Sequence, residues 1–264
     1  MKQPNSLNEK PFLSITVITK NEADRIDNLL QSASIADEVV IVDSGSTDDT
    51  VEICRTWGAL VIHQEWLGYS AQKQLAMESA RGQWILNLDA DEALSGELSQ
   101  EILSALVNAE IQVSGFSIPR LSRYLNRWIR HGGWYPDRKV RLVRRGCARW
   151  VGSGLHEKLE VVGKVEGLKH PVLHYVYRNI SDQISTINRF SSVDADHRDN
   201  PASAAYVFWG VVHAAGKFLE CVFWKRGFLD GIPGIIIGVN SAFYVFLKHA
   251  KAWEKRLITK DRTD

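Results

Sequence analysis

The chain has 264 residues, 45% of them hydrophobic, and carries 32 lysines and arginines against 31 aspartates and glutamates. This length fits one large domain, or one domain with an appendage. The balanced charge excludes a protein that binds polyanions with its whole surface, so we expect no nucleic-acid partner. Cys54, Cys147 and Cys221 form no C-x-x-C pair, which argues against a zinc site or a disulfide framework and suits a reducing compartment. The polar first ten residues lack the apolar segment of a signal peptide, so we expect a cytoplasmic location.

Strand and helix signals alternate over the first 95 residues. Short apolar runs rich in β-branched residues predict strands, and apolar residues spaced three and four apart predict helices between them. The predicted strands cover residues 12–18, 38–42, 59–63 and 84–92, and the predicted helices cover residues 23–34, 50–57 and 69–79. Alternation at this spacing indicates βαβ units and a mostly parallel sheet with right-handed crossovers.

The turn after the first predicted strand, residues 19–22, contains no glycine. A dinucleotide-binding fold would place G-x-G-x-x-G at this turn, and a Walker phosphate loop is also missing from the sequence. A nucleotide would therefore have to be held by other loops.

The stretch 84–92 is an apolar run that ends in two carboxylates, Asp89 and Asp91. On an extended backbone, side chains two residues apart point to the same side, and the carboxyl ends of parallel strands are where open α/β sheets bind ligands. Neighbouring carboxylates repel each other unless a cation or a proton lies between them. Mg²⁺ or Mn²⁺ suits such oxygen ligands and usually brings substrate phosphates. The alternative is a solvated turn, because D-x-D is a common sequence.

Basic residues gather after the acidic turn, beyond a predicted helix over residues 95–108 and a short predicted strand over 115–119. Residues 111–156 contain ten lysines or arginines and one acid, Asp137. Such a run is commonly a solvated basic face, and the alternative is a role in holding phosphate.

The tail, residues 204–247, is apolar and aromatic, with interspersed charges and basic residues on its flanks. Pro233 and its neighbouring glycines interrupt the most apolar segment, so we expect no spanning helix. Two amphipathic helices with basic flanks predict docking at a lipid interface, and a helical cap on the sheet or a dimer contact is the alternative. The predicted domains are therefore a sheet domain, 1–200, and a membrane-associating helical tail, 201–264.

Three motifs occur at the predicted strand ends, and they lie at residues 17–22 (Val-Ile-Thr-Lys-Asn-Glu), 42–48 (Val-Asp-Ser-Gly-Ser-Thr-Asp) and 88–92 (Leu-Asp-Ala-Asp-Glu). In this order they resemble an inverting family-2 glycosyltransferase of GT-A fold. Shorter segments extend the resemblance to the bacterial enzymes that add a β-linked sugar, often glucose, to the lipopolysaccharide inner core; these are residues 133–137, 155–157 and 227–231.

This resemblance implies an α/β fold of GT-A type, with a mostly parallel sheet flanked by helices and a C-terminal amphipathic helical extension. It implies a UDP-sugar donor, Mn²⁺ or Mg²⁺ as cofactor, and a lipid-linked or lipopolysaccharide-core acceptor. The enzyme would then work peripherally on the cytoplasmic face of the inner membrane. Donor sugar, acceptor linkage and oligomeric state are not encoded in these motifs.

The resemblance also assigns residues to the donor. Thr19 and Glu22 match positions that contact the nucleobase, and Asp43 matches an acid that hydrogen-bonds the base or the ribose. Lys73 matches a position near the nucleotide. Arg144, with its basic neighbours on the predicted strand, is expected to clamp the diphosphate or an anionic acceptor.

Metal and catalytic roles follow from the same resemblance. Asp89 would face the ribose and help to hold the metal, whose principal ligand would be Asp91, and His156 or His174 would complete the metal sphere. Inversion in a single displacement needs one carboxylate to deprotonate the acceptor hydroxyl. Glu157 is the first candidate for this base and Asp137 is the second.

Two other functions are compatible with parts of the pattern. A phosphatase of the haloacid dehalogenase type also uses a D-x-D after an apolar strand, although it usually places the pair on its first strand. A catalytically silent, nucleotide-binding scaffold at the membrane is the other alternative, and its retention of every donor-site acid argues against it.

Overall fold

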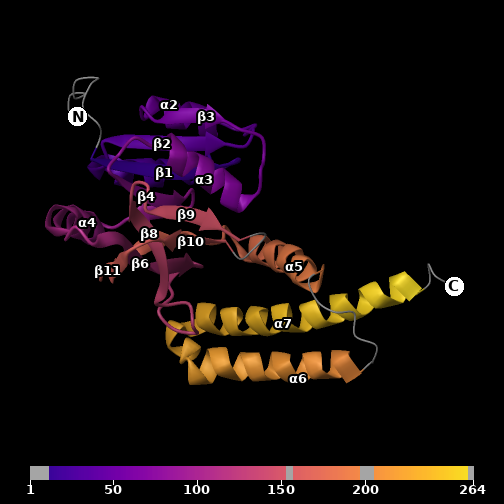
Figure 1. Ribbon diagram of the computed structural model, residues 1–264. Coiled ribbons are helices and arrows are strands. Elements are labelled where there is room, and N and C mark those ends of the chain that lie inside the picture. The colour runs from indigo at the N-terminus through magenta and orange to yellow at the C-terminus, as the bar shows by residue number, and fades with distance from the viewer. Residues whose placement is uncertain (1–11, 153–156, 197–204, 261–264) are drawn as a thin grey trace. The chain divides into compact units, whose positions relative to one another are not determined.

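A computed structural model describes residues 12–152, 157–196 and 205–260 (Figure 1). The chain forms two compact units. The sheet unit comprises the described residues up to Arg120 together with Arg138–His174, and the helical unit comprises Leu121–Asp137 and the described residues from Tyr175 onward.

The sheet unit is built on one large sheet, and Figure 1 shows its first strands in indigo. Its strands are β1 (Leu13–Thr19), β2 (Glu38–Asp43), β3 (Leu60–His63), β4 (Trp84–Asp89), β5 (Glu92–Leu94), β6 (Val113–Tyr124), β8 (Asp137–Arg144), β11 (Lys164–Gly167) and β12 (Val172–His174). The order is β3-β2-β1-β4-β8-β6-β12-β5, with β11 beside β6. β1 pairs in parallel with β2 and β4, and β2 with β3, which confirms the predicted parallel core. β8 is antiparallel to β4, and β9 (Ala148–Val151) and β10 (Lys158–Val161) form a separate antiparallel pair.

Helices cover this sheet, and they are α1 (Ile26–Ser32), the 3₁₀ turn η1 (Ala33–Ile35), α2 (Thr50–Thr56), α3 (Tyr69–Ser79) and α4 (Gly96–Asn108). Side chains of β4 alternate between two apolar clusters: Leu86 packs in the cluster that includes Leu29 and Leu98, and Ile85 packs in the cluster that includes Met77. Burial on both faces explains why this strand is an almost continuous apolar run.

The helical unit contains β7 (Arg127–Trp128), α5 (Ile180–Asp196), α6 (Ala205–Leu219), the π-helical turn η2 (Glu220–Trp224), the 3₁₀ turn η3 (Gly227–Asp230) and α7 (Gly231–Lys260). α6 and α7 lie side by side, and α5 packs on α7 (Figure 1). Tyr124, Ile129 and Ile237 form a small buried cluster in this unit. Because α5 packs on α7, the compact helical unit begins well before the predicted boundary at residue 200.

The expectation that Pro233 interrupts the last apolar segment is wrong, since α7 runs without a break from Gly231 to Lys260. Pro233 lies in the first turn, where backbone N–H groups have no partner within the helix. Two stretches, 205–224 and 227–258, are long and apolar enough to cross a membrane by length and composition alone. The helical structure of the tail is therefore more continuous than its glycines and Pro233 indicate.

Gly82 is fixed by a polar network at the start of the parallel strands. Its N–H donates to Ser14 Oγ (2.9 Å), which donates to Glu38 Oε2 (2.6 Å), and Glu38 also accepts from Arg81 Nε (2.7 Å). A Cβ at residue 82 would lie 2.5 Å from Ser14 Oγ and 2.7 Å from Ser14 N. The close approach of these two backbones leaves room for glycine alone.

We therefore expect Gly82→Ala to lower the free energy of unfolding by about 1–3 kcal/mol, the usual cost of overpacking a tight site. The matched control is Gly96→Ala in α4, where an added Cβ meets no atom within 4 Å. Urea denaturation followed by circular dichroism measures both variants. Equal free energies of unfolding for the two variants would show that the hydrogen-bonded residues around Gly82 can shift to accommodate a Cβ at little cost.

Candidate functional site

The carboxyl ends of the parallel strands meet at one edge of the sheet. Thr19, at the end of β1, lies opposite Asp43 at the end of β2, and Ile18 lies opposite Asp89 at the end of β4. The predicted residues Thr19, Asp43 and Asp89 are therefore brought to the same edge, as expected for a ligand site in an open α/β sheet.

Asp43 shapes the loop after β2. It is 2% exposed, and its Oδ1 accepts hydrogen bonds from Thr19 Oγ1 (3.0 Å) and Ser46 Oγ (2.5 Å). Its Oδ2 accepts from the N–H groups of Gly45 (2.9 Å) and Ser46 (2.8 Å). These four bonds use the acceptor positions of the carboxylate, so Asp43 holds the turn that Gly45 makes at φ +83°. Its contact with a base or ribose stays a prediction.

The loops after β1 and β2 are joined to each other. Asn21, in the left-handed conformation at φ 56°, donates its N–H to Ser46 Oγ (2.9 Å) and accepts from the N–H of Thr47 (2.8 Å). The Glu22 N–H donates to Thr50 Oγ1 (2.9 Å). These bonds explain why the two motifs occur together, since each loop positions the other.

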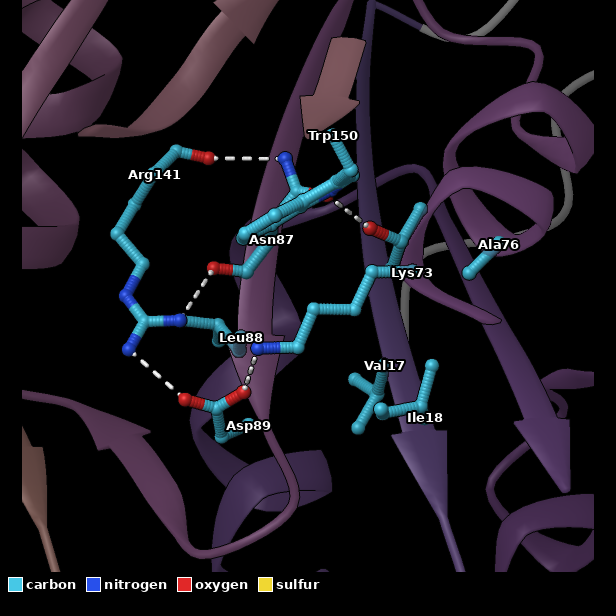
Figure 2. A pocket seen from close by; sticks show the side chains of 10 residues that line it. Val17, Ile18, Lys73, Ala76, Asn87, Leu88, Asp89, Arg141 and Trp150 are labelled. Atoms are coloured by element: carbon cyan, nitrogen blue, oxygen red, sulfur yellow. Dashed lines mark hydrogen bonds and ion pairs between the residues drawn. The ribbon is translucent and has the colours of Figure 1, made fainter. Parts of the chain in front are cut away.

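Asp89 is held between two cations (Figure 2). Lys73 Nζ of α3 lies 2.9 Å from Asp89 Oδ1, and Arg141 Nη2 of β8 donates to Asp89 Oδ2 over 2.9 Å. Arg141 also donates to Glu92 Oε1 (2.6 Å), and Glu92 Oε2 accepts the N–H of Asp89 (3.0 Å), which closes the turn after β4. Two segments distant in sequence, α3 and β8, are thus tied to the carboxylate of Asp89 at the end of β4.

These contacts set the charge states of the site. Burial alone would raise the pKa of Asp89, but the charges of Lys73 and Arg141 outweigh it and hold the pKa well below the ordinary aspartate value. Burial would lower the pKa of Lys73, but attraction to Asp89 raises it above the ordinary lysine value. Burial raises the pKa of Glu92, and repulsion by Asp89 adds to that effect, while Arg141 opposes it. Asp89 and Lys73 are therefore charged near neutral pH.

Asp91 does not share these partners. The strand ends at Asp89, the chain turns at residues 90 and 91, and Asp91 Oδ2 lies 3.3 Å from His174 Nε2 and 3.4 Å from Arg25 Nη1. The expectation that both acids project from one extended strand is wrong, because the bond from Asp89 N–H to Glu92 turns the backbone between them. The two carboxylates have separate surroundings.

A divalent cation fits Asp91 better than Asp89. In the part of the chain that the structure describes, no three histidine, cysteine or acidic side chains gather as a metal site. Asp91 and His174 nevertheless bring a carboxylate and an imidazole together, and Mn²⁺ or Mg²⁺ commonly takes few protein ligands and completes its sphere with phosphates and water. Within the described ranges, Asp89 already has two protein cations at 2.9 Å from its oxygens, against one, Arg25 at 3.4 Å, for Asp91, so its predicted metal role has less support. His156 lies outside the described residues.

The two candidate bases lie in different units. Glu157 belongs to the sheet unit, where its Oε1 lies 3.4 Å from Lys73 Nζ, so the same lysine contacts both Glu157 and Asp89. Asp137 is the first residue of β8 and belongs to the helical unit. The structure therefore connects Glu157 with the acidic edge of the sheet, and Asp137 stays the second candidate on sequence grounds.

The structure does not bring Arg144, the predicted clamp for the diphosphate or an anionic acceptor, to the acidic edge of the sheet. Arg144 pairs with Trp84, the first residue of β4, and its guanidinium lies over the Trp84 ring at 4.5 Å. Five residues of extended chain, roughly 16 Å, separate that end of β4 from Asp89. The register of β8 gives the position near Asp89 to Arg141 instead.

Three further residues at the site were not singled out by the sequence: Glu92, Asn87 and Trp150. Asn87 Oδ1 accepts hydrogen bonds from Thr16 Oγ1 (3.1 Å) and Trp150 Nε1 (3.3 Å), and the Trp150 ring lies 4.8 Å from Lys73 Nζ. A polar residue inside a buried apolar strand, such as Asn87, is the signal that could have revealed it, because buried amides need partners. Asn87 and Trp150, together with Thr16 and Lys73, line a cavity of about 10 Å³, which is too small for a sugar nucleotide.

Comparison with known sequences gives a consistent family. Residues 14–155 match the family described as Glycosyl transferase family 2. An uncharacterized glycosyltransferase of Rickettsia prowazekii is 32% identical over 90% of this chain and 86% of its own. The lipopolysaccharide core biosynthesis glycosyltransferase LpsC of Rhizobium meliloti is 28% identical over 93% of each chain.

A similar fold occurs among solved structures. The mannosyltransferase PcManGT of Pyrobaculum calidifontis, solved in complex with GDP-Man and Mn²⁺, matches 96% of this chain and 92% of its own with a TM-score of 0.53 and 16% sequence identity. At this identity the likeness concerns the fold, and it confirms the predicted GT-A class.

The charge balance at Asp89 can be tested by removing one cation. We expect Lys73→Met to raise the pKa of Asp89 by at least about one pH unit, because an opposite charge within 4 Å favours the ionised carboxylate. Carbon-13 NMR of the Asp89 carboxyl group, assigned with Asp89→Asn, measures the change. Lys158→Met is the control, since Lys158 is exposed and pairs with Glu160. An unchanged Asp89 titration in Lys73→Met would contradict the assigned ion pair.

The same ion pair fixes the sign of the pH dependence. The depressed pKa of Asp89 contributes stability that is present above the pKa of an unfolded aspartate and is lost as the pH falls through the folded value. The raised pKa of Lys73 contributes stability below the pKa of an unfolded lysine, and this is lost as the pH rises through the folded value. The stability lost in Lys73→Met should therefore be largest between these two limits.

Proposed function

Because the chain belongs to glycosyl transferase family 2, we propose that it transfers a sugar from a UDP-sugar, with inversion, to a lipid-linked saccharide such as the lipopolysaccharide core. The observation that carries this proposal is the acidic edge at the end of β4, where Asp89 is locked by two cations and Asp91 lies beside His174. The similarity to LpsC, which is named for lipopolysaccharide core biosynthesis, supports the acceptor class. Family membership also removes the phosphatase alternative.

Asp91 and His174 are the residues that would hold Mn²⁺ or Mg²⁺. When bound, the cation would neutralise charge on the diphosphate as it leaves. Lys73 and Arg141 keep Asp89 ionised and fixed in orientation, so that it can accept hydrogen bonds from a ribose at the edge of the sheet. The loops after β1 and β2, which are joined by the bond from Asn21 N–H to Ser46 Oγ, would contact the nucleobase beside this position.

Glu157 is the proposed general base. Its contact with Lys73 places it in the same cluster as Asp89, and an ionised carboxylate can accept the proton of an acceptor hydroxyl during a single displacement. Glucose as the sugar follows from the sequence resemblance, and a panel that includes UDP-glucose and GDP-mannose tests both sugar and nucleotide.

We expect Asp91→Asn to reduce acceptor-dependent release of nucleoside diphosphate by about 100-fold or more, the scale of losing one charge-stabilising group. Electron paramagnetic resonance of Mn²⁺ should show weaker binding in the same variant. Glu97→Gln, which changes an exposed acid of α4, is the control. Full turnover by Asp91→Asn would refute the metal role, and donor binding without transfer to any acceptor would favour the silent scaffold.

Membrane association is proposed from the exposed apolar side chains of the helical unit. Trp224 is 86% exposed, Ile232 is 73% exposed and Phe223 is 58% exposed. Large contiguous apolar surfaces mark interaction sites, and a lipid interface suits aromatic side chains with flanking lysines. We propose that this surface docks on the cytoplasmic face of the inner membrane, where a lipid-linked acceptor would be presented.

Introducing two negative charges on this apolar surface should weaken the binding of the protein to lipid vesicles. We expect Phe223→Asp combined with Trp224→Asp to lower the bound fraction in vesicle flotation by tenfold or more, since burial of each large side chain is worth about 1.5–3 kcal/mol. Ile111→Asp is the matched control, because Ile111 is 95% exposed and belongs to the sheet unit. Equal flotation of both variants would rule out this surface as the docking site.

A further inference from the structure

The helical unit encloses an open cavity of about 1090 Å³, which we call the α5–α7 cavity. Its walls come from α5, α6, η2 and α7, together with Trp134 and Tyr177. This volume slightly exceeds the usual range of small-molecule sites in proteins, about 300–1,000 Å³. None of its lining residues takes part in the sugar transfer proposed above.

One wall of the cavity carries a side-chain amide. Gln183 lines the cavity, and its Oε1 accepts from Tyr124 Oη and from Asn240 Nδ2. These two bonds fix the amide in orientation, and its Nε2 is a donor that suits a ligand with hydrogen-bond-accepting oxygens.

The charged side chains of the lining are mainly basic. Lys217 and Lys248 line the cavity against one lining acid, Glu220, whose carboxylate lies 2.9 Å from Lys217 Nζ. Lys248 Nζ lies 3.7 Å from Oδ2 of Asp194, an acid of α5 that does not line the cavity. His213 and His249 line it as well, with 3.5 Å between His213 Nδ1 and His249 Nε2. His249 Nδ1 must donate to the carbonyl oxygen of Val245 (2.8 Å), so its Nε2 can accept from His213. The lining therefore complements an anionic group such as a phosphate.

The lining also includes apolar and aromatic side chains, among them Trp134, Phe190 and Val212, beside the polar Thr186 and Ser241. Such a wall suits an alkyl chain. The same helices expose large apolar side chains to the outside, among them Phe208 at 64% and Trp209 at 55% on α6. An amphiphile that is anionic at one end and apolar along its length matches both the lining and the proposed lipid surroundings of these helices.

We infer that the α5–α7 cavity binds one anionic membrane phospholipid, with its phosphate near Lys217, Lys248 and Gln183 and an acyl chain along Trp134 and Phe190. This inference rests on the membrane association proposed above but not on sugar transfer. Binding needs neither nucleotide nor metal, so the site would fix the helical unit to a chosen class of lipid rather than to apolar surface in general.

The probe is phosphatidic acid with a photoactivatable diazirine on one acyl chain, mixed into phosphatidylcholine vesicles that carry the full-length protein. After illumination, peptide mass spectrometry should locate the cross-links on residues that line the cavity. Gly216→Phe should reduce these cross-links several-fold, because an added Cβ at this lining residue meets no atom within 4 Å and the ring would take up space at the cavity wall. Replacing glycine also favours a helix, so the variant should fold.

Ala215→Phe is the matched control: it adds the same ring to an exposed neighbour in α6 that does not line the cavity, and it should keep the cross-links. A photoactivatable phosphatidylcholine, and the double variant Lys217→Met with Lys248→Met, should each lower cavity cross-linking several-fold. If the phosphatidylcholine probe or the double lysine variant gave as much cavity cross-linking as phosphatidic acid with the unaltered protein, the proposed preference for an anionic headgroup would be refuted.

The remaining outcomes separate the two proposals. Cross-links that map only to outward-facing residues, while the protein still floats with vesicles, overturn the cavity site and leave membrane association intact. A full-length protein that does not float overturns both. A change in oligomeric state for Gly216→Phe but not Ala215→Phe would assign the cavity to a second copy of the chain and overturn the lipid. None of these results alters the expected transfer activity.

Discussion

The ion pairs of Asp89 with Lys73 and Arg141 are the interactions on which the candidate site depends. They join α3 and β8 to the end of β4, and through Glu92 and Glu157 they reach β5 and the segment before β10. In a buried site, a carboxylate without these cations would lose its charge or unfold its surroundings. The ion pairs therefore shape the turn that presents Asp91.

This arrangement divides the two acids of the D-x-D sequence between two tasks. Asp89 is an internal anchor whose oxygens are already bound by protein cations, and Asp91 lies beside His174, where an additional cation can be held. Among the residues that the structure describes, two protein cations balance Asp89, whereas Asp91 has one, Arg25 at 3.4 Å, in addition to His174.

The helical unit uses charge in a different way. Lys217 and Glu220 interrupt the apolar pattern of the tail, which in the sequence argues against a membrane helix, and Lys248 belongs to its basic flank. In the structure these same residues line the α5–α7 cavity, and Lys217 pairs with Glu220. The same helices also expose large apolar side chains, such as Phe208 and Trp209.

The sequence alone determined the alternation of strands and helices, the loops at the strand ends and the family, because local periodicity and short motifs carry that information. Tertiary structure decided which cation meets which acid. Ten basic residues occur between residues 111 and 156, and only the register of β8 against β4 places Arg141 beside Asp89 and Arg144 at the far end. Asn87, Trp150 and the continuous α7 likewise follow from contacts between distant segments, which no local pattern encodes.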